Sequence, residues 1–422
     1  MDWTSKQGRI LTADGSAPEL YTAERGFPFL DTELPHYYLS RNLCHEVFSK
    51  WAKDHREEQL NSKETSAKPE NVNPICGAWS RPLFMGQWEH STSEQDTVYN
   101  LQSNTLFIDL RIPRRLSQSL LPKVTHIPFN ASCLHNKKNL ERVMKSWTWH
   151  EIRLYARRHV FGGFTRLSWL EQDQLPSKQM HTNVMTSRKS EKKGRPVCTR
   201  HHCIDWNYVG SPRNRPNKWF VEIHPSHTNQ WKEWSFAKDD FGQHYYWEKW
   251  ERLDGGGCFT DKRKEGNTTH KNKKMKYDTR QDNILALRKQ VTKDDPRDGI
   301  LIVVGDHFNY LFDRELSDVN REKYNCASSL VEAIDQIMSE NDREAASEYL
   351  SINAGHGTIS SGWKIDCSIQ FWTEGSFLFD PRNEIQISGT DLEDCIFLWD
   401  NCQWDIYETS FNDLNELRIL FR

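Results

Sequence analysis

The side chains best placed to do chemistry lie in the segment Leu106–Ile112, where apolar and charged residues alternate. With a period of two, Asp109 and Arg111 share one face of a strand, roughly 7 Å apart along the backbone. The planar guanidinium of Arg111 could anchor a carboxylate or phosphate. A buried Asp–Arg pair can also be a purely structural charge couple, and both interpretations stay open. The opposite face is apolar and consists of Leu106, Ile108, Leu110 and Ile112.

A strand with one apolar and one charged face is typical of a barrel or sandwich wall, not of a buried parallel sheet. In a small barrel the charged face could line the lumen. We expect Gln102, on the preceding segment, to be a neighbour, because a turn at residues 103–104 would make the two segments antiparallel. Arg81, near the start of the folded body, completes this group of candidate ligand-binding residues.

A second set of polar residues lies in the segment Thr199–Asn207. Strict alternation puts His201 and Asp205 on one face, roughly 13 Å apart, so each needs a partner from another strand. His201 could act as a general acid or base, since its ordinary pKa lies near neutrality. The alternative is a polar barrel interior whose groups are satisfied by hydrogen bonds and water.

Two carboxyl groups stand among apolar or aromatic neighbours. Glu248 shares a face with Tyr246 and Trp250, and burial there would raise its pKa. Such an aromatic box suits a cationic or planar ligand, although an aromatic wall with Glu248 at its rim is the alternative. Asp306 follows an apolar strand face and Gly305, which suggests a bulge. Asp306 must therefore either pair with an arginine or take part in chemistry.

Several common kinds of site are excluded. The chain contains no P-loop, GxGxxG, GxSxG or HExxH motif. His224 and His227 have no third placed ligand, and the ten cysteines form no CxxC pair. We therefore expect no cofactor and no metal. Any catalysis would be acid–base work such as isomerisation, cyclisation or dehydration.

Composition and hydropathy predict the organisation of the chain. The chain has 422 residues, 17 Trp and a net charge of −3. An aromatic-rich chain should fold, and its near-neutral charge makes nucleic acid an unexpected partner. The expected fold class is mainly β, with two lipocalin-like antiparallel β-barrel modules, a few helices and long polar insertions. The expected boundaries are a polar extension with one helix (1–74), a first barrel (75–255), a basic loop (256–282) and a second module (283–422).

Two helices are expected besides the N-terminal one. Apolar residues recur at helical spacing in residues 139–160, and Gly162-Gly163 would end that helix. A second helix is expected over residues 328–350. The remaining apolar runs between residues 79 and 253, and again after residue 283, read as short strands.

Several segments resemble known proteins. They are Trp79-Ser80-Arg81, DTVYNLQ, LFIDLRIP, CTRHHCIDW, YWEKW and DGILIVVGDHF. Together they resemble poorly characterised bacterial and fungal proteins with lipocalin-like barrels. The last segment is similar to a strand of the fungal casein-kinase-interacting family, which implies two barrels in tandem. The resemblance covers residues 76–380 and departs at Arg200, where a tryptophan is common.

Two functions follow as alternatives. In the first, the barrel lumen binds a small, partly apolar organic ligand, with or without cofactor-free acid–base catalysis. In the second, the protein is a non-enzymatic scaffold whose basic segments 177–196 and 261–280 bind an acidic partner such as a kinase or RNA. No secretory signal or membrane span is visible, so we expect a cytoplasmic protein without a membrane partner.

Overall fold

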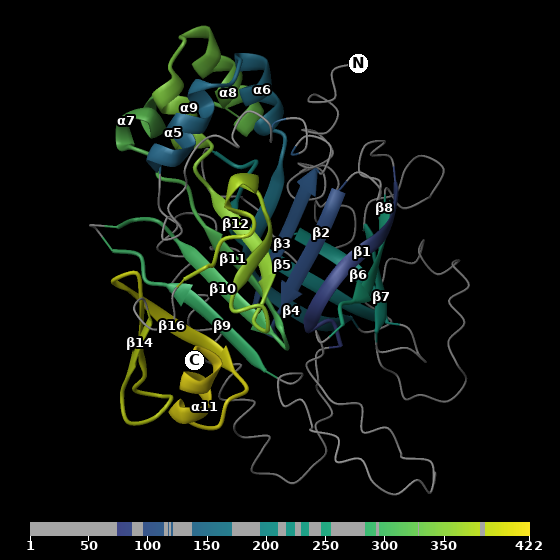
Figure 1. Ribbon diagram of the computed structural model, residues 1–422. Coiled ribbons are helices and arrows are strands. Elements are labelled where there is room, and N and C mark those ends of the chain that lie inside the picture. The colour runs from purple at the N-terminus through teal and green to yellow at the C-terminus, as the bar shows by residue number, and fades with distance from the viewer. Residues whose placement is uncertain are drawn as a thin grey trace, which may run out of the picture.

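The computed structural model (Figure 1) describes most of the chain after residue 73. The described residues are 74–86, 96–113, 117, 120, 137–170, 195–209, 217–223, 229–235, 246–254, 283–292, 295–327, 329–379 and 385–422. The expected N-terminal helix and the basic segment 261–280 lie outside them, as does the basic segment 177–196 except for its last two residues, which begin β5.

The first half of the described chain forms a closed antiparallel barrel in which eight strands pair in chain order. Pairing of β1 with β8 closes it. This confirms the barrel expected from the alternating segments. The strands are β1 (Gly77–Gly86), β2 (Asp96–Gln102), β3 (Leu106–Pro113), β4 (His159–Leu170), β5 (Arg195–Asp205), β6 (Asn217–Ile223), β7 (Gln230–Ser235) and β8 (Tyr246–Arg252).

The second half forms an eight-stranded antiparallel sheet in the order β13-β12-β11-β10-β9-β16-β15-β14. Within the described residues its end strands, β13 and β14, do not pair, so this module is a sheet and not the second barrel that we expected. The strands are β9 (Ile284–Lys289), β10 (Gly299–Val304), β11 (His307–Phe312), β12 (Asn353–Thr358), β13 (Lys364–Ser368), β14 (Ile385–Ser388), β15 (Ile396–Trp399) and β16 (Cys402–Thr409).

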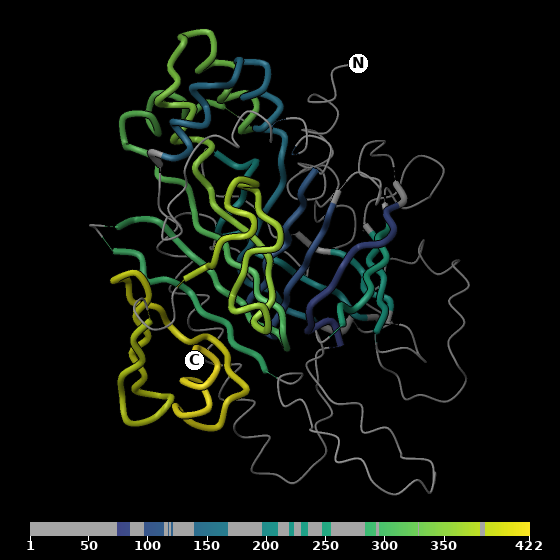
Figure 2. Tube along the Cα trace, viewed as in Figure 1, coloured from purple at the N-terminus to yellow at the C-terminus, as the bar shows by residue number. Residues whose placement is uncertain are grey.

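The sheet stays open because other elements cover both of its faces. Every residue of β10 is buried, as expected for a strand with cover on each side. One face packs on the outer wall of the barrel, where Ile108 of β3 joins the same apolar core as Ile300 and Ile302. The other face packs against α11 (Leu414–Leu420) and the aromatic side chains around Trp363. Figure 2 shows the barrel, purple to teal, beside the green and yellow sheet.

Polar contacts add to this interface between barrel and sheet. The Glu408 carboxylate of β16 accepts hydrogen bonds from the Thr105 backbone N–H and hydroxyl, both at 3.1 Å. It also accepts one from Asn104 Nδ2 at 2.5 Å. The buried His356 ring stacks on Tyr99 of β2 at 3.9 Å between centroids. The β3 backbone therefore has its apolar face outward against the sheet, which leaves its charged face for the lumen.

Helices from both halves pack together at one end of the molecule (Figure 1). Each of the two helices expected from the sequence is divided into two shorter helices in the structure. Thr148 begins a new helix with a capping box to Glu151, and the second break falls at Asn341, which has a positive φ of 57°. Arg153 joins the two pairs through a bidentate ion pair with Asp335. The helices are α5 (Lys137–Lys145), α6 (Trp149–Tyr155), α8 (Leu330–Ser339) and α9 (Arg343–Tyr349), with α7 (Asp318–Lys323) and the 3-10 turn η7 (Phe371–Thr373) beside them.

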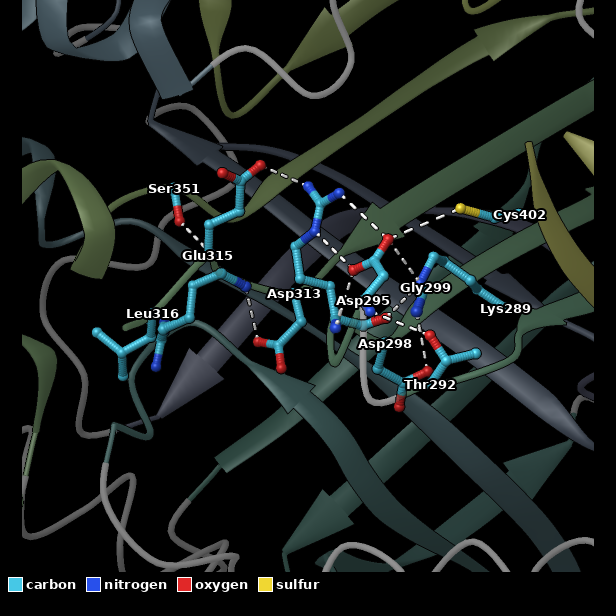
Figure 3. A network of polar contacts seen from close by, with 12 residues as sticks. Lys289, Thr292, Asp295, Asp298, Gly299, Asp313, Glu315, Leu316, Ser351 and Cys402 are labelled. Atoms are coloured by element: carbon cyan, nitrogen blue, oxygen red, sulfur yellow. Dashed lines mark hydrogen bonds and ion pairs between the residues drawn. The ribbon is translucent and has the colours of Figure 1, made fainter. Parts of the chain in front are cut away.

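A second polar network lies on the sheet, away from the barrel lumen (Figure 3). Asp295 accepts from Arg297 and lies 3.1 Å from Lys289 Nζ. Burial alone would raise the pKa of Asp295, but Arg297 and Lys289 together outweigh it and lower the pKa to about 2. Its carboxylate ties the β9–β10 connection to the end of β9.

Candidate ligand site in the barrel lumen

Cross-strand pairing defines which side chains face the lumen. Asp109 lies directly opposite Asn100 on β2 and Phe161 on β4. Directly opposite residues share a face, and the outward face of β3 is the apolar one, so these three side chains point inward. The same reasoning carries around the barrel to its other inward side chains. They include Trp79, Arg81, Gln102, Phe107, Arg111, Arg200, Trp219, Trp231, Glu233, Glu248 and Trp250.

Buried ion pairs cross the lumen. Arg81 Nη1 lies 2.6 Å from Glu248 Oε1, and the two side chains are 0% and 1% exposed. Arg111 donates from Nε and Nη2 to the two carboxylate oxygens of Asp109 at 2.8 and 3.1 Å. Arg111 Nη1 also lies 3.6 Å from Glu248 Oε1. The pairs therefore form one network, in which arginine forks alternate with carboxylates.

Arg200 extends this network on β5. Its Nη1 lies 3.7 Å from Asp109 Oδ2, and its Nη2 donates to Gln102 Oε1 at 2.5 Å. The guanidinium also lies over the rings of Phe107 and Trp219, at 4.3 and 5.0 Å from their centroids. A cation sandwiched between aromatic faces is stabilised by the ring quadrupoles.

The arginines keep Asp109 ionised. Burial alone would raise the pKa of this carboxyl, but the guanidinium groups of Arg111, Arg200 and Arg81 together hold the pKa below its ordinary value. Burial likewise opposes the charge on Arg111, and Asp109 and Glu248 more than offset it, so the pKa of Arg111 is raised well above normal. The network therefore favours the charged form of both Asp109 and Arg111.

Glu233 differs from the other carboxyl groups. It lies directly opposite Glu248 on β7 and β8, where Cβ atoms are roughly 4.5–5.5 Å apart. Burial, and then the negative charge of Glu248, raise the pKa of Glu233 well above its ordinary value, against a weaker opposite effect of Arg200 and Arg111. The lumen thus holds a carboxyl group whose protonated form is favoured beside one that is ion-paired.

Indole rings form the wall around these carboxyls. Trp231 stacks on Trp250 with centroids 5.4 Å apart, and Trp79 meets Trp231 edge to face at 5.9 Å. Trp79 donates its indole N–H to the Ile75 carbonyl at 2.9 Å. The other indole donors are different: within the described part of the chain, the buried Nε1 atoms of Trp219, Trp231 and Trp250 have no hydrogen-bond partner.

Further polar atoms in the lumen also find no hydrogen-bond partner in the residues that the structure describes. They are both side-chain atoms of Asn100, Glu233 Oε2, Glu248 Oε2 and Gln102 Nε2. A buried polar group without a partner costs about 1–3 kcal/mol. Such groups are rare in folded proteins, and where several converge they mark a place for water or a ligand.

The structure brings six of the residues singled out in the sequence into one network or its wall. Asp109, Arg111, Arg81 and Glu248 form the ion pairs, Gln102 binds Arg200, and Trp250 stacks in the wall. Tyr246 is the first residue of β8, opposite Gly86, and its side chain lies outside the described part.

His201 and Asp205 do not share a face. The register between β4 and β5 shifts at Gly162/Gly163, leaving Cys203 as an extra residue. His201 lies opposite Phe164, which packs outward on Tyr407 of the sheet. Asp205 Oδ2 instead lies 2.7 Å from His202 Nδ1, within hydrogen-bond distance. The bulge broke the strict alternation that we had assumed.

The two glycines of this bulge have a different role from the helix stop that we expected. They lie inside β4, and α6 ends earlier, at Tyr155. A Cβ on Gly163 would come within 2.0 Å of the His201 carbonyl oxygen. Only glycine allows the two strands to approach this closely.

Asp306 lies in the turn between β10 and β11, far from the lumen. Gly305 before it has a φ of 61°, as a tight turn requires, and is not a bulge. Asp306 accepts hydrogen bonds from the Ser360 backbone N–H and hydroxyl at 2.8 and 2.5 Å. Its partners are therefore local hydroxyl and amide donors, which indicates a role in turn structure.

The sequence analysis did not select Glu233, Arg200 or Asn100 as site residues. The signal for Glu233 was present, because Trp231 and Glu233 alternate with Lys232 and Trp234 as their counterparts do on β8. Asn100 lies two residues before Gln102 on the same strand. Arg200 stood out only as the departure from the lipocalin-like pattern.

Within the described residues, no group of His, Cys, Asp or Glu side chains could hold a metal ion. No described helix is long and apolar enough to cross a membrane. The described cysteines are free thiols, and burial raises the pKa of Cys198, in the lumen wall, to about 11.

Comparison with known proteins adds little. No family model matches the chain, and no curated protein matches it. One solved structure, of the uncharacterised protein YLR301w from Saccharomyces cerevisiae, aligns with 12% identity and a TM-score of 0.37 over 79% of this chain and 99% of that one.

Proposed function

We propose that the barrel binds a small, partly apolar organic molecule in its lumen, against the arginine–carboxylate network. The observation that supports this best is the set of buried polar atoms without hydrogen-bond partners. Asn100, Glu233 and three indole N–H groups converge on the same interior. A barrel core built only for stability would be better served by apolar side chains than by these groups.

The donors and acceptors define the kind of molecule that fits. Indole rings offer flat apolar surface, and indole N–H groups donate only. Asn100 both donates and accepts. A planar molecule with carbonyl or ring-nitrogen acceptors along its edge would satisfy these atoms and cover the indole faces.

Acid–base chemistry is the second part of the proposal. Glu233 is a carboxylic acid that can give a proton at neutral pH, because its pKa is raised. Glu248, paired with Arg81, offers a carboxylate that can accept one. Two carboxyls in such contrasting environments are how cofactor-free isomerases and lyases divide the roles of acid and base.

The test is to expose purified protein to a cell extract, remove unbound material, and identify retained molecules by denaturing mass spectrometry. Asn100→Leu removes the amide from the lumen, whereas Asp306→Asn changes a carboxyl outside it and is the matched control. Retention by the wild-type protein and the control, but at least about tenfold weaker in Asn100→Leu, supports the proposal. Equal retention by all three, or none by the wild-type protein, contradicts it.

Catalysis is tested separately, once a retained molecule is identified. Turnover should fall in Glu233→Gln with little change in binding, because the amide keeps the shape of the acid but gives up no proton. If Glu233→Gln turns the molecule over normally, the lumen is a binding site alone. The scaffold alternative depends on the basic segments 177–196 and 261–280, which lie outside the described residues except for residues 195 and 196.

A further inference from the structure

One of the buried cations outside the barrel lumen lies next to the end of α6. Arg158 precedes β4 and is 1% exposed. Its guanidinium lies between the rings of Tyr155 and Phe371, at 4.5 and 5.3 Å from their centroids. One nitrogen, Nη2, donates to Ser117 Oγ at 3.1 Å. The Nε and Nη1 atoms of Arg158 are buried and have no hydrogen-bond partner among the described residues.

No carboxylate pairs with Arg158 among the described residues. Glu374 acts on it electrostatically but accepts the Ser368 backbone N–H instead. The chain from Ile112 to Leu140, which includes Ser117, contains no Asp or Glu. This contrasts with the buried Arg81 and Arg288 and the partly buried Arg111, each of which lies against a carboxylate.

A second unused donor lies in the same aromatic cluster. Trp147 is buried, and its Nε1 has no hydrogen-bond partner. Its ring packs on Tyr155 at 5.1 Å and on Phe371 at 6.3 Å, so it contacts both rings that hold Arg158. The unused groups here are all donors, which indicates a ligand that only accepts hydrogen bonds.

We propose that Arg158 anchors a second binding site, separate from the lumen, for a carboxylate borne by a small apolar or aromatic molecule. A single buried guanidinium is neutralised by a single negative charge, so a monoanionic carboxylate fits better than a doubly charged phosphate. Nη1 and Nη2 present the parallel pair of N–H groups that a carboxylate accepts, and the rings provide apolar cover. Without such a ligand the buried charge is costly, and burial lowers the pKa of Arg158.

The first test uses the intact protein and sodium benzoate as the probe. Thermal unfolding is followed against benzoate at constant ionic strength, with sodium phosphate and sodium chloride as separate arms. Because the site is buried, samples are incubated until the unfolding temperature is constant. We expect benzoate to raise this temperature and phosphate to do so no more than chloride. A response to phosphate equal to that of benzoate, or no response to benzoate, overturns the proposal.

Variants show whether benzoate binds at Arg158. Arg158→Met removes the cation but keeps an unbranched side chain, and Arg153→Met removes the surface arginine of α6 as the matched control. Arg158→Met should weaken benzoate binding by about tenfold or more, and Arg153→Met should leave it unchanged. Equal binding by Arg158→Met contradicts the site.

If Arg158→Met does not fold, Trp147→Phe serves instead, because it removes only the indole donor. It should weaken benzoate binding measurably, and an unchanged affinity counts against the proposal. The lumen variant Asn100→Leu should bind benzoate normally. Failure of this site is thereby distinguished from failure of the lumen site.

Discussion

Glu233 and Glu248 lie directly opposite each other inside the closed barrel, and only Glu248 is paired with an arginine. Two carboxyls this close cannot both carry charge cheaply in a buried site. Arg81 Nη1 donates to Glu248 at 2.6 Å, whereas burial and the neighbouring Glu248 raise the pKa of Glu233 and favour its protonated form.

The pH dependence of stability should reveal the proton on Glu233. Because its pKa is raised on folding, its contribution to stability is complete below the unfolded pKa of about 4.3 and is lost as pH rises through the folded pKa. Glu233→Gln cannot ionise. Its stability relative to the wild-type protein should therefore increase by about 1.4 kcal/mol per pH unit across that window.

Urea unfolding at pH 5, 6, 7 and 8 measures this difference. Glu251→Gln, on the same pair of strands but partly exposed, is the control and should follow the wild-type protein. Parallel wild-type and Glu233→Gln profiles would show that Glu233 is ionised in the folded state.

Removal of Arg81 should be strongly destabilising. Arg81→Met leaves Glu248 buried with only the more distant Arg111, and we expect a loss of about 3–5 kcal/mol in the free energy of unfolding. Arg81→Met/Glu248→Gln should recover much of that loss, since no uncompensated charge remains. Chemical denaturation of the single and double variants measures both. Lys249→Met, which breaks an exposed ion pair on β8, should cost less than about 1 kcal/mol.

Glu408 should couple the barrel to the sheet. Glu408→Ala leaves the Thr105 N–H and the Asn104 amide without their acceptor, at a cost of about 2–3 kcal/mol. Differential scanning calorimetry should show a lower unfolding temperature, whereas Glu393→Ala, at an exposed turn, should not change it. An unchanged unfolding temperature in Glu408→Ala would mean that the apolar contacts alone hold the two layers together.

His356 should make the same interface sensitive to acid. Burial, and then His307, lower the pKa of His356 well below 6.5. A group with a lowered folded pKa contributes its stability above the unfolded pKa and loses it as pH falls toward the folded pKa. Wild-type stability should therefore decrease below about pH 6.5.

His356→Phe keeps the ring against Tyr99 but cannot titrate, so its stability should decrease less between pH 7.5 and 5.5. Urea unfolding across that range measures the difference. His150→Gln, at an exposed site on α6, should retain the wild-type slope. Identical slopes for wild type and His356→Phe would place the acid sensitivity elsewhere.

Where strands are regular, the alternation of apolar and polar residues predicted correctly which side chains share a face. On β3, the two faces of Leu106–Ile112 correctly separated lumen from interface, and Asp109–Arg111 followed from it. Alternation failed on β5, because the bulge at Cys203 depends on how closely β4 approaches and not on β5 itself. Asp306 was misplaced for a related reason: Gly305 can serve a bulge or a turn, and only the pairing of β10 with β11 decides between them.

The arginine–carboxylate network in the lumen could not be predicted without the strand register of the whole barrel. Arg81 and Glu248 meet because β1 closes on β8, a contact between the two ends of the barrel sequence. Likewise, no local pattern shows that the second set of strands would cover the barrel wall instead of closing on itself. That outcome depends on two apolar faces that are distant in the chain and complementary in shape.

The cover on the outer wall of the barrel has a consequence for synthesis. Ile108 and Phe164 are translated well before Ile300 and Tyr407, the side chains that shield them. A nascent chain that has completed all eight barrel strands thus exposes a broad apolar wall until the sheet strands leave the ribosome. During that interval we expect the incomplete chain to depend on chaperones, or on slow translation, to avoid aggregation.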